Sequence, residues 1–269
     1  MPDKKFDRVL ELGCGIGYQS AFLSKIANNV MATDLPDPDI QAHAPGMEVA
    51  KNLHNKLNVK NVQFIACSAE TLPFEDSSFD LIYSSHVLEH IPDRDKALAE
   101  MARVLKPGGI YFCVTPVSFE KLYSFLNYYL LLVTRIFALL GRIVKRIFWS
   151  KDRTSQPGVS VDGHTAKAKS TFWASFPFPP PHGTGRHFLS ELVNWTPGKW
   201  KKEQTKHDEF EFVSQQTTQW LPFLPVLGFI HPVLGTRMHA RTRSFELRTG
   251  KFRFFQCFGI NTVIILKRK

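Results

Sequence analysis

Short apolar runs alternate with helix-like segments over the first 117 residues of this chain. Helix-like stretches at 18–26 and 94–104 are predicted, and the second ends before the proline and glycines of residues 106–109, because such residues after a basic last turn stop a helix. Strands that alternate with helices indicate a parallel sheet, so we expect a doubly wound α/β fold. The runs predicted as strands are residues 8–12, 29–33, 62–67, 79–85 and 110–115.

The rest of the chain follows a different pattern. A long basic and apolar segment at 121–149 is followed by a segment at 150–181 that is predicted to be a loop and contains a proline-rich run. Thr196-Pro197 predicts a helix start, since threonine caps a helix and proline suits its first turn. Strands six and seven are expected at 209–213 and 261–266. We therefore expect a seven-stranded, mostly parallel sheet with a large insertion between strands five and six, divided as a core at 1–120, an insertion at 121–208 and the last strands at 209–269.

Charge divides the chain in the same way. Residues 1–120 have a net charge of −5, residues 121–208 have +9 and residues 209–269 have +6. A partner of the second half is therefore expected to be anionic or to be bounded by anions. The four cysteines have neither metal nor disulfide spacing, which predicts free, reduced thiols in the cytoplasm.

A glycine-rich loop between the first strand and the first helix carries the main chemical signal. This loop has the sequence Glu11-Leu12-Gly13-Cys14-Gly15-Ile16-Gly17. Its glycines allow a tight turn and let the backbone lie against a ligand. Asp34 ends the second strand, where a carboxylate accepts hydrogen bonds from ribose hydroxyls. The glycine spacing departs from the dinucleotide fingerprint, and Glu11 would repel a pyrophosphate. This combination favours a cationic nucleotide without phosphate, as in S-adenosylmethionine.

Further motifs follow in a fixed order. They are Ala69-Glu70 with Leu72-Pro73-Phe74, then Phe79-Asp80-Leu81-Ile82, Val87-Leu88-Glu89-His90-Ile91 and Arg103-Val104-Leu105-Lys106-Pro107-Gly108-Gly109. With the glycine loop, they make residues 7–117 resemble the class I S-adenosylmethionine-dependent methyltransferases. The resemblance is greatest to the small-molecule branch that includes ubiquinone- and menaquinone-biosynthesis enzymes. It implies a Rossmann-like methyltransferase fold, S-adenosylmethionine as the cofactor and a small-molecule acceptor.

The resemblance and the loop together predict the cofactor site. Family members usually have an acid where Ser68 stands, so Ser68 or Glu70 is expected to take over the contact to adenine. Most relatives also carry one or two helices before the first strand, so either the chain is a fragment or its cover comes from elsewhere in the sequence. The residues predicted to bind the cofactor are Glu11, Gly13, Cys14, Gly15, Gly17, Asp34, Leu35, Ser68, Ala69, Glu70, Ser84 and Ser85.

His86 directly follows the fourth strand, where the methyl group is presented, and is the candidate general base. Its alternative role is packing or shaping of the cofactor site. His86, Glu89 and His90 share one helical face with metal-ligand character. Some quinone-pathway O-methyltransferases have an acid at the first of these positions, so no metal is expected here. Glu89 and His90 are instead expected to cap and pack the helix start.

The segment 121–149 contains no acidic residue and is amphipathic when it is placed on a helix. Lys121, Arg135 and Arg142 fall near one stripe, and the apolar residues fall on the other side. Its longest uncharged stretch, residues 122–134, is shorter than the roughly 20 residues needed to span a bilayer. The favoured interpretation is a helix that lies on an anionic membrane at the inner face and collects a lipid-like acceptor. The alternatives are a spanning helix and a helix that packs over the active site or against a second subunit.

Two other functional classes stay open. The arginines and phenylalanines of residues 237–255 suit a nucleic-acid methyltransferase, although Ser84-Ser85-His86-Val87 replaces the motif of enzymes that methylate base amino groups. A non-catalytic relative docked on a membrane is the other alternative. The intact glycine loop and Asp34 favour a working cofactor site over that alternative. The acceptor's identity and the oligomeric state are left open by the sequence.

Overall fold

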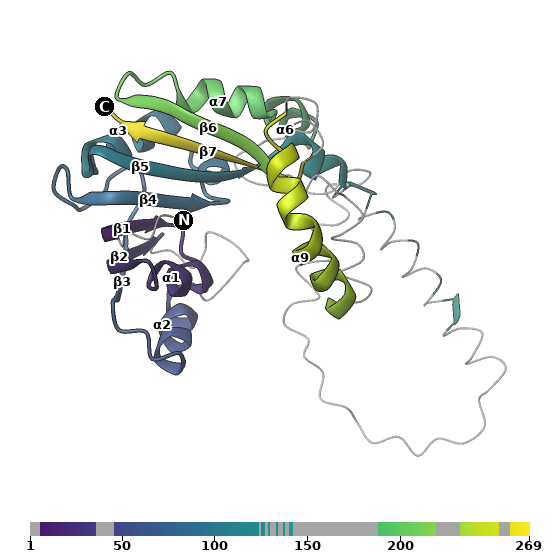
Figure 1. Ribbon diagram of the computed structural model, residues 1–269, viewed down its shortest axis with the longest axis horizontal. Helices are drawn as coiled ribbons and strands as arrows, with labels where there is room; N and C mark the ends of the chain where they lie inside the picture. The colour runs from purple at the N-terminus through teal and green to yellow at the C-terminus, as the bar shows by residue number, and fades with distance from the viewer. Residues whose placement is uncertain are drawn as a thin grey trace, which may run out of the picture.

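The computed structural model describes residues 6–35, 46–123, 188–218, 232–252 and 259–269, together with Phe125, Leu126, Tyr129, Val133, Phe137, Leu140 and Gly141. It contains a seven-stranded sheet in the order β3-β2-β1-β4-β5-β7-β6 (Figure 1). The strands are β1 (Phe6–Leu12), β2 (Ala27–Asp34), β3 (Val62–Ala66), β4 (Phe79–Ser85), β5 (Leu105–Pro116), β6 (Phe210–Thr218) and β7 (Asn261–Arg268). Strands β1 to β5 are parallel, and β7 pairs antiparallel with both β5 and β6. The predicted doubly wound, mostly parallel sheet is confirmed.

Strand boundaries differ from the prediction at β6, which continues to Thr218 beyond the predicted residue 213, and at β5. This strand begins at Leu105, before the predicted residue 110, and includes the residues expected to form only a turn. A register irregularity lets Leu105 pair with Phe79 while Ile110 pairs with Leu81. Gly108 takes a positive φ of 78° within this stretch. The helix before it, α3 (Arg94–Val104), does end where the sequence predicts.

Two apolar clusters cover opposite faces of the sheet. On one face, α3 and α7 (Pro197–Gln204) pack against β1, β4, β5 and β7 through residues that include Leu98, Met101 and Trp200. On the other, Leu23 at the end of α1 (Tyr18–Leu23) packs against β1, β2 and β4. Such two-sided burial explains the near-continuous apolar runs of the parallel strands.

The return of the chain from the insertion is attached to the end of β5. Thr196 caps α7 by accepting a 3.3 Å hydrogen bond from the Lys199 N–H, with Pro197 in the first turn as predicted. The Trp200 indole N–H donates a 2.8 Å hydrogen bond to the carbonyl of Pro116. Because Trp200 is 1% exposed, this contact anchors the insertion's last helix in the core.

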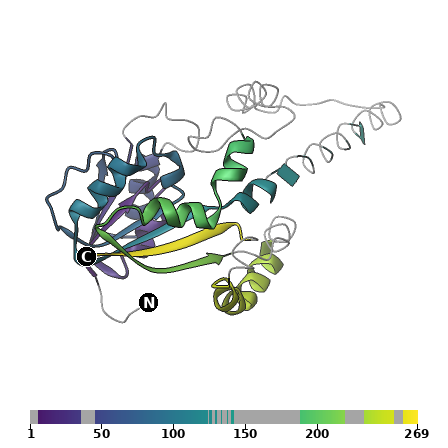
Figure 2. The same cartoon turned by 90° about the horizontal axis from the view of Figure 1, so that it is seen from above.

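Helical residues follow β5 directly. Residues 118–123 are helical, as are the described residues from Phe125 to Gly141, and we call them the post-β5 helix. Figure 2 shows this helix leaving the body of the molecule, with α6 (Phe188–Asn194) beside its first residues. Helix α9 (Pro232–Thr249) lies beyond the end of the sheet where β7 begins.

Lys121 corrects one part of the membrane prediction. It is only 3% exposed, and its Nζ lies 3.0 Å from Oε2 of Glu191, a buried residue of α6. The same ammonium lies 4.4 Å from the centre of the Trp195 ring. The prediction that Lys121 is an unbalanced surface cation is therefore wrong. Its nearer acid, Glu191, is distant in sequence, and a second acid, Glu120, lies 3.7 Å away just before the predicted segment.

Several predictions concern residues outside those described. They include Arg135 and Arg142 of the amphipathic segment and the loop-like residues 150–181. Among the residues that the structure describes, no helix combines the length and apolarity needed to cross a bilayer.

Candidate active site

The glycine loop joins the end of β1 to α1 at the carboxyl edge of the sheet. Gly13, Gly15 and Gly17 have φ values of 67°, 50° and 83°, a left-handed conformation that favours glycine. The Cys14 N–H donates to the carbonyl of Thr33 over 2.9 Å, and the Gly17 N–H donates to the carbonyl of Cys14 over 2.9 Å. These bonds hold the loop as a compact turn against β2.

Close packing surrounds two of the three glycines. A Cβ at Gly13 would collide with the side chain of Val87, and one at Gly17 would lie 2.7 Å from the Cβ of Ala50. His54, on α2 (Gly46–Lys56), is 3% exposed and donates from Nε2 to the Gly17 carbonyl over 2.8 Å. Among the residues that the structure describes, a Cβ at Gly15 would meet no atom within 4 Å, so these residues leave the loop open at its middle glycine.

Glu11 lies at the base of the loop and is 2% exposed. Its carboxylate accepts a hydrogen bond from the Ser20 hydroxyl of α1. Burial raises the pKa of Glu11 from 4.5 to about 7, an effect that Ser20 opposes and the nearby charge of Asp34 reinforces. A positively charged ligand would favour the ionised form of this carboxyl group.

Asp34 ends β2 beside the loop, as predicted. One carboxylate oxygen accepts a 2.7 Å hydrogen bond from the Gly15 N–H, and the other accepts one of 2.9 Å from the Leu35 N–H. Asp34 therefore braces the loop at the glycine that borders open space. Leu35 is 44% exposed next to it.

The remaining predicted cofactor residues differ in how they lie. Ser68 accepts from the Glu70 N–H over 3.1 Å, and Glu70 accepts from the Asp93 N–H over 3.0 Å at the start of α3. Ser84 is 1% exposed and its hydroxyl lies 3.0 Å from the Tyr111 hydroxyl in the core. Its side chain therefore points into the core. Cys14 is also buried, at 6% exposed.

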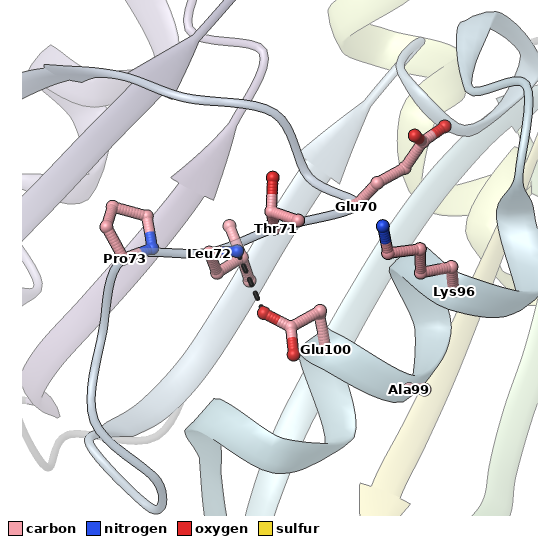
Figure 3. Close-up of a pocket in the computed structure, with 7 residues that line it drawn as sticks. All are labelled: Glu70, Thr71, Leu72, Pro73, Lys96, Ala99 and Glu100. Carbon is pink, nitrogen blue, oxygen red and sulfur yellow. Dashed lines mark hydrogen bonds between the residues drawn. The ribbon is translucent and has the colours of Figure 1, made fainter.

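A surface pocket of about 450 Å³ lies beside the predicted adenine side of the site. Figure 3 shows it between the segment after β3 and the outer face of α3. Glu100 of α3 accepts a 2.8 Å hydrogen bond from the Leu72 N–H and braces that segment. The residues that line it are Glu70, Thr71, Leu72, Pro73, Lys96, Ala99 and Glu100. The glycine loop and His86 are not among them.

His86 lies directly after β4, at the same edge. It has a φ of 57°, and its N–H donates to the carbonyl of Val114 over 2.9 Å. Its Nδ1 lies 3.4 Å from Oε1 of Glu89 in the short helix η1 (Leu88–His90). The hydrogen bond to Glu89 raises the pKa of His86, against burial, with help from Glu120 and Asn261.

The donor set fits a cationic nucleoside better than a phosphate. Two carboxylates, Glu11 and Asp34, adjoin the loop, and in the described part of the chain neither forms an ion pair with a lysine or arginine. The space beside Gly15 lets a ligand approach the backbone. Both features suit S-adenosylmethionine, whose amino group and sulfonium are positive.

Comparison with known proteins agrees with this geometry. Residues 10–113 match the family described as "Methyltransferase domain". They form a class I methyltransferase domain. The curated relatives include the ubiquinone/menaquinone biosynthesis C-methyltransferase UbiE of Xanthomonas oryzae, which is 37% identical over 148 residues, 53% of this chain and 55% of the relative. The relative of the same name in Psychromonas ingrahamii is 36% identical over 129 residues, 47% of this chain and 50% of that protein.

The class I methyltransferase domain has S-adenosylmethionine as its cofactor, as the loop predicts. The chain spans about half the length of the curated relatives it matches. A solved structure of the MccD protein has a TM-score of 0.50 over 99% of this chain and 91% of that chain, at 16% identity, and so shares the fold.

Sequence reasoning missed the supporting residues of this methyltransferase domain. Ser20, His54 and Val87 each contact the glycine loop or Glu11, yet they come from three different elements. Asn261 reaches His86 from the start of β7. Only Ser20 carried a local signal, as a small polar residue on the first helix after the loop.

Proposed function

We propose that the protein transfers a methyl group from S-adenosylmethionine to a hydroxyl or an activated carbon of a small-molecule or lipid-like acceptor. The observation that carries the proposal is the order of the strands. The glycine loop follows β1, Asp34 is the last residue of β2 and His86 follows β4, and these three strands are neighbours in the sheet. A cofactor site and a candidate base therefore share one edge.

The residues of this edge divide into two roles. The backbone of Gly13, Gly15 and Gly17 would lie against the cofactor, Asp34 would accept from its ribose, and Glu11 would face its positive charge. When bound, S-adenosylmethionine supplies a methyl group that its sulfonium has already activated. His86 would remove a proton from an acceptor that arrives protonated.

The relatives support a ring-containing acceptor. Their printed names place them in ubiquinone and menaquinone biosynthesis as C-methyltransferases. The shared region is 53% of this chain for the Xanthomonas relative and includes the matched domain at 10–113. A quinone-type acceptor is therefore our proposal for this chain.

The post-β5 helix supports delivery of the acceptor from a membrane. Its exposed apolar residues are spaced along one helical face, and we call them the apolar stripe. Residues 121–208 carry a net charge of +9, which would attract an anionic bilayer surface. The apolar stripe consists of Leu122, Leu126, Val133, Phe137 and Leu140, which are 52%, 66%, 45%, 68% and 50% exposed.

Nucleic-acid methylation is the second candidate, because α9 presents a basic surface. Arg237, Arg241, Arg243 and Arg248 are all exposed, and Phe252 just beyond the helix is 63% exposed. Exposed arginines and aromatic rings bind phosphates and stack on bases. Anionic lipid would use the same arginines without the need for stacking.

A transfer assay with three acceptors tests the proposal. Protein and S-adenosylmethionine labelled in its methyl group are incubated with vesicles that contain a prenylated hydroquinone, with a soluble hydroquinone, or with single-stranded RNA. We expect label in the organic extract of the vesicle sample. Label in the RNA would overturn the small-molecule proposal, and binding of S-adenosylmethionine without transfer in any sample would also count against it.

Calorimetry of S-adenosylmethionine binding to the Asp34→Ala variant tests the cofactor site separately from methyl transfer. Loss of its charged acceptor should weaken S-adenosylmethionine binding on the order of 10- to 100-fold in calorimetry. Glu75→Ala removes an acid that is exposed and lies outside the site, so its affinity should equal that of the wild type. Equal affinities in all three proteins would remove Asp34 from the site.

A further inference from the structure

Three parts of the molecule meet at His86. The histidine follows β4, and its N–H continues the hydrogen bonding to β5 through Val114. The start of β7 lies at the end of β5, because Asn261 pairs with Pro116. Asn261 and Glu120 both act on the imidazole. The ring therefore lies where the insertion leaves and the last strand enters the sheet.

The backbone of His86 is in an uncommon conformation. A φ of 57° is left-handed, and residues with a Cβ adopt it at a cost of about 1–3 kcal/mol. The sharp turn ends β4 and lets Glu89, three residues later, approach the imidazole. The turn therefore forms a contact between two side chains that a straight strand would separate.

Glu89 is the buried half of this contact. Its side chain is 0% exposed, whereas that of His86 is 41% exposed, and Oε1 lies 3.4 Å from Nδ1. A carboxylate beside Nδ1 accepts a hydrogen bond from the N–H of that nitrogen and so selects the tautomer in which Nε2 has a free lone pair. Distances of this kind are often long before substrate binds.

We propose that Glu89 is a positioning residue that holds His86 as the general base, and that the acceptor therefore carries an acidic hydroxyl of the phenol or enol class. This inference rests on the proposed function, because it concerns the same site. It replaces the packing role that the sequence indicates for Glu89. An acceptor that is already an anion, such as a thiolate, would gain nothing from the pair.

The proton is accounted for at each step. The O–H bond of the acceptor breaks, the electron pair stays on oxygen, and the proton forms a bond to Nε2 of His86. Glu89 stabilises the imidazolium that results, because its carboxylate is buried next to the ring. The imidazolium then returns the proton to water through the exposed side of the ring.

The electrostatics around the ring give the expected pH dependence. Glu89, Glu120 and Asn261 raise the pKa of His86, with Glu89 contributing most. A base must be neutral to accept a proton, so kcat/KM should rise with pH through the pKa of His86. Loss of the Glu89 charge should move that rise to lower pH.

Histidine NMR tests the pair without an acceptor. In wild-type protein, ring nitrogen shifts of His86, assigned with His86→Asn, should show the Nδ1–H tautomer in the neutral form. The tautomer with the proton on Nε2 would overturn the proposal. This measurement needs no variant at Glu89, so it stays decisive even where such a variant fails to fold.

Variants at Glu89 test the charge. In Glu89→Gln the pKa of His86 should fall by about 1, since an adjacent opposite charge is lost. Glu89→Asp keeps the charge and should lower the pKa less, and Glu120→Gln should have a smaller effect than Glu89→Gln. A pKa that is unchanged in a folded Glu89→Gln protein would overturn the proposal.

Kinetics separate this inference from the proposed function. With an active acceptor, Glu89→Gln should lower kcat about 10- to 100-fold and shift the pH profile to lower pH, while the Kd for S-adenosylmethionine stays the same. A variant of normal activity and normal pH profile would overturn the role of Glu89. If no hydroxyl acceptor is methylated by wild-type protein, the proposed function fails, and the NMR result still decides whether Glu89 holds His86.

Discussion

The surroundings of Glu11, at the edge of the sheet proposed to bind the cofactor, change the acidity of its side chain. Glu11 is buried next to Asp34, so two carboxyl groups lie close together in a region of low polarity. Burial and the neighbouring charge raise the pKa of Glu11 to about 7. In the free protein the ionised form of Glu11 is therefore disfavoured, and a bound cationic ligand would stabilise it.

The raised pKa of Glu11 predicts that the stability of the protein depends on pH. The folded pKa of about 7 lies above the ordinary 4.5, so folding takes up a proton between these values. The contribution of Glu11 is fully present below about pH 4.5 and is lost as pH rises through 7. Glu11→Gln should remove this loss, so its advantage in unfolding free energy should grow by about 2–3 kcal/mol between pH 5 and pH 8.

Thermal or urea unfolding at several pH values measures this effect. Glu75→Gln, at an exposed acid, is the matched control and should follow the wild type. Parallel curves for Glu11→Gln and wild type would show that the buried carboxyl group does not titrate in this range.

At the scale of elements, residues outside the glycine loop restrict which side chains the loop can carry. The glycine loop is packed from two sides, by Val87 after β4 and by Ala50 and His54 on α2. The left-handed φ of each glycine is needed for the turn, but the close approach of Val87 makes Gly13 doubly restricted. Backbone conformation and packing therefore both exclude a side chain there.

Gly13→Ala should destabilise the protein by about 1–3 kcal/mol from backbone strain alone, with the collision with Val87 added. Val87→Ala in the same chain should recover the part that is due to the collision. Gly198→Ala, on α7 where an added methyl group would meet nothing within 4 Å, should be neutral or slightly stabilising. Chemical denaturation of the four proteins gives the two contributions, and a neutral Gly13→Ala would contradict the close packing around this glycine.

The insertion is attached to the core by a buried ion pair. Lys121 at the start of the post-β5 helix and Glu191 of α6 have side chains that are 4% and 1% exposed. Glu120 is a second, more distant acid for Lys121, at 3.7 Å. Removal of Lys121 or Glu191 leaves a buried charge without its nearest opposite charge, which costs up to about 3–5 kcal/mol, whereas removal of both costs much less.

Lys121→Met and Glu191→Leu should therefore each destabilise the protein by several kcal/mol, and the double variant should recover most of that loss. A double-mutant cycle by denaturant unfolding measures the coupling. Additive effects of the two substitutions would show that the pair does not hold the insertion in place.

For the whole molecule, the arrangement separates the cofactor from the proposed acceptor surface. The acidic cofactor core and the basic second half differ in charge, and the apolar stripe of the post-β5 helix is exposed. This arrangement would present the active-site edge toward a membrane.

Vesicle sedimentation tests that arrangement. Leu126→Asp with Phe137→Asp should reduce binding to anionic vesicles at least tenfold, because the charges oppose burial of the apolar stripe. Leu57→Asp is a matched control, since Leu57 is 55% exposed but lies after α2. Binding that is equal in all three proteins would exclude the stripe, and preferential binding of single-stranded RNA would favour the nucleic-acid candidate.

The sheet and the cofactor edge were largely predictable because their signals are local. An apolar run specifies a buried strand, and a glycine loop after it specifies a turn that accepts a ligand. Glu11, Asp34 and His86 could be placed at strand ends from the order of the elements. The side-chain direction of Ser84 could not be judged in this way, because the sequence does not tell that its hydroxyl meets Tyr111 in the core.

The sequence by itself determined the class of fold, the nature of the cofactor and the strand ends that we propose carry the chemistry, since each depends on neighbouring residues. Only the tertiary structure decided which side chains contact one another across the fold. Lys121 meets Glu191, His54 holds Gly17, and Glu89 approaches His86 through a left-handed turn. Two of these contacts join segments far apart in the chain, and the third depends on a backbone conformation that histidine rarely adopts, so none can be derived from local pattern.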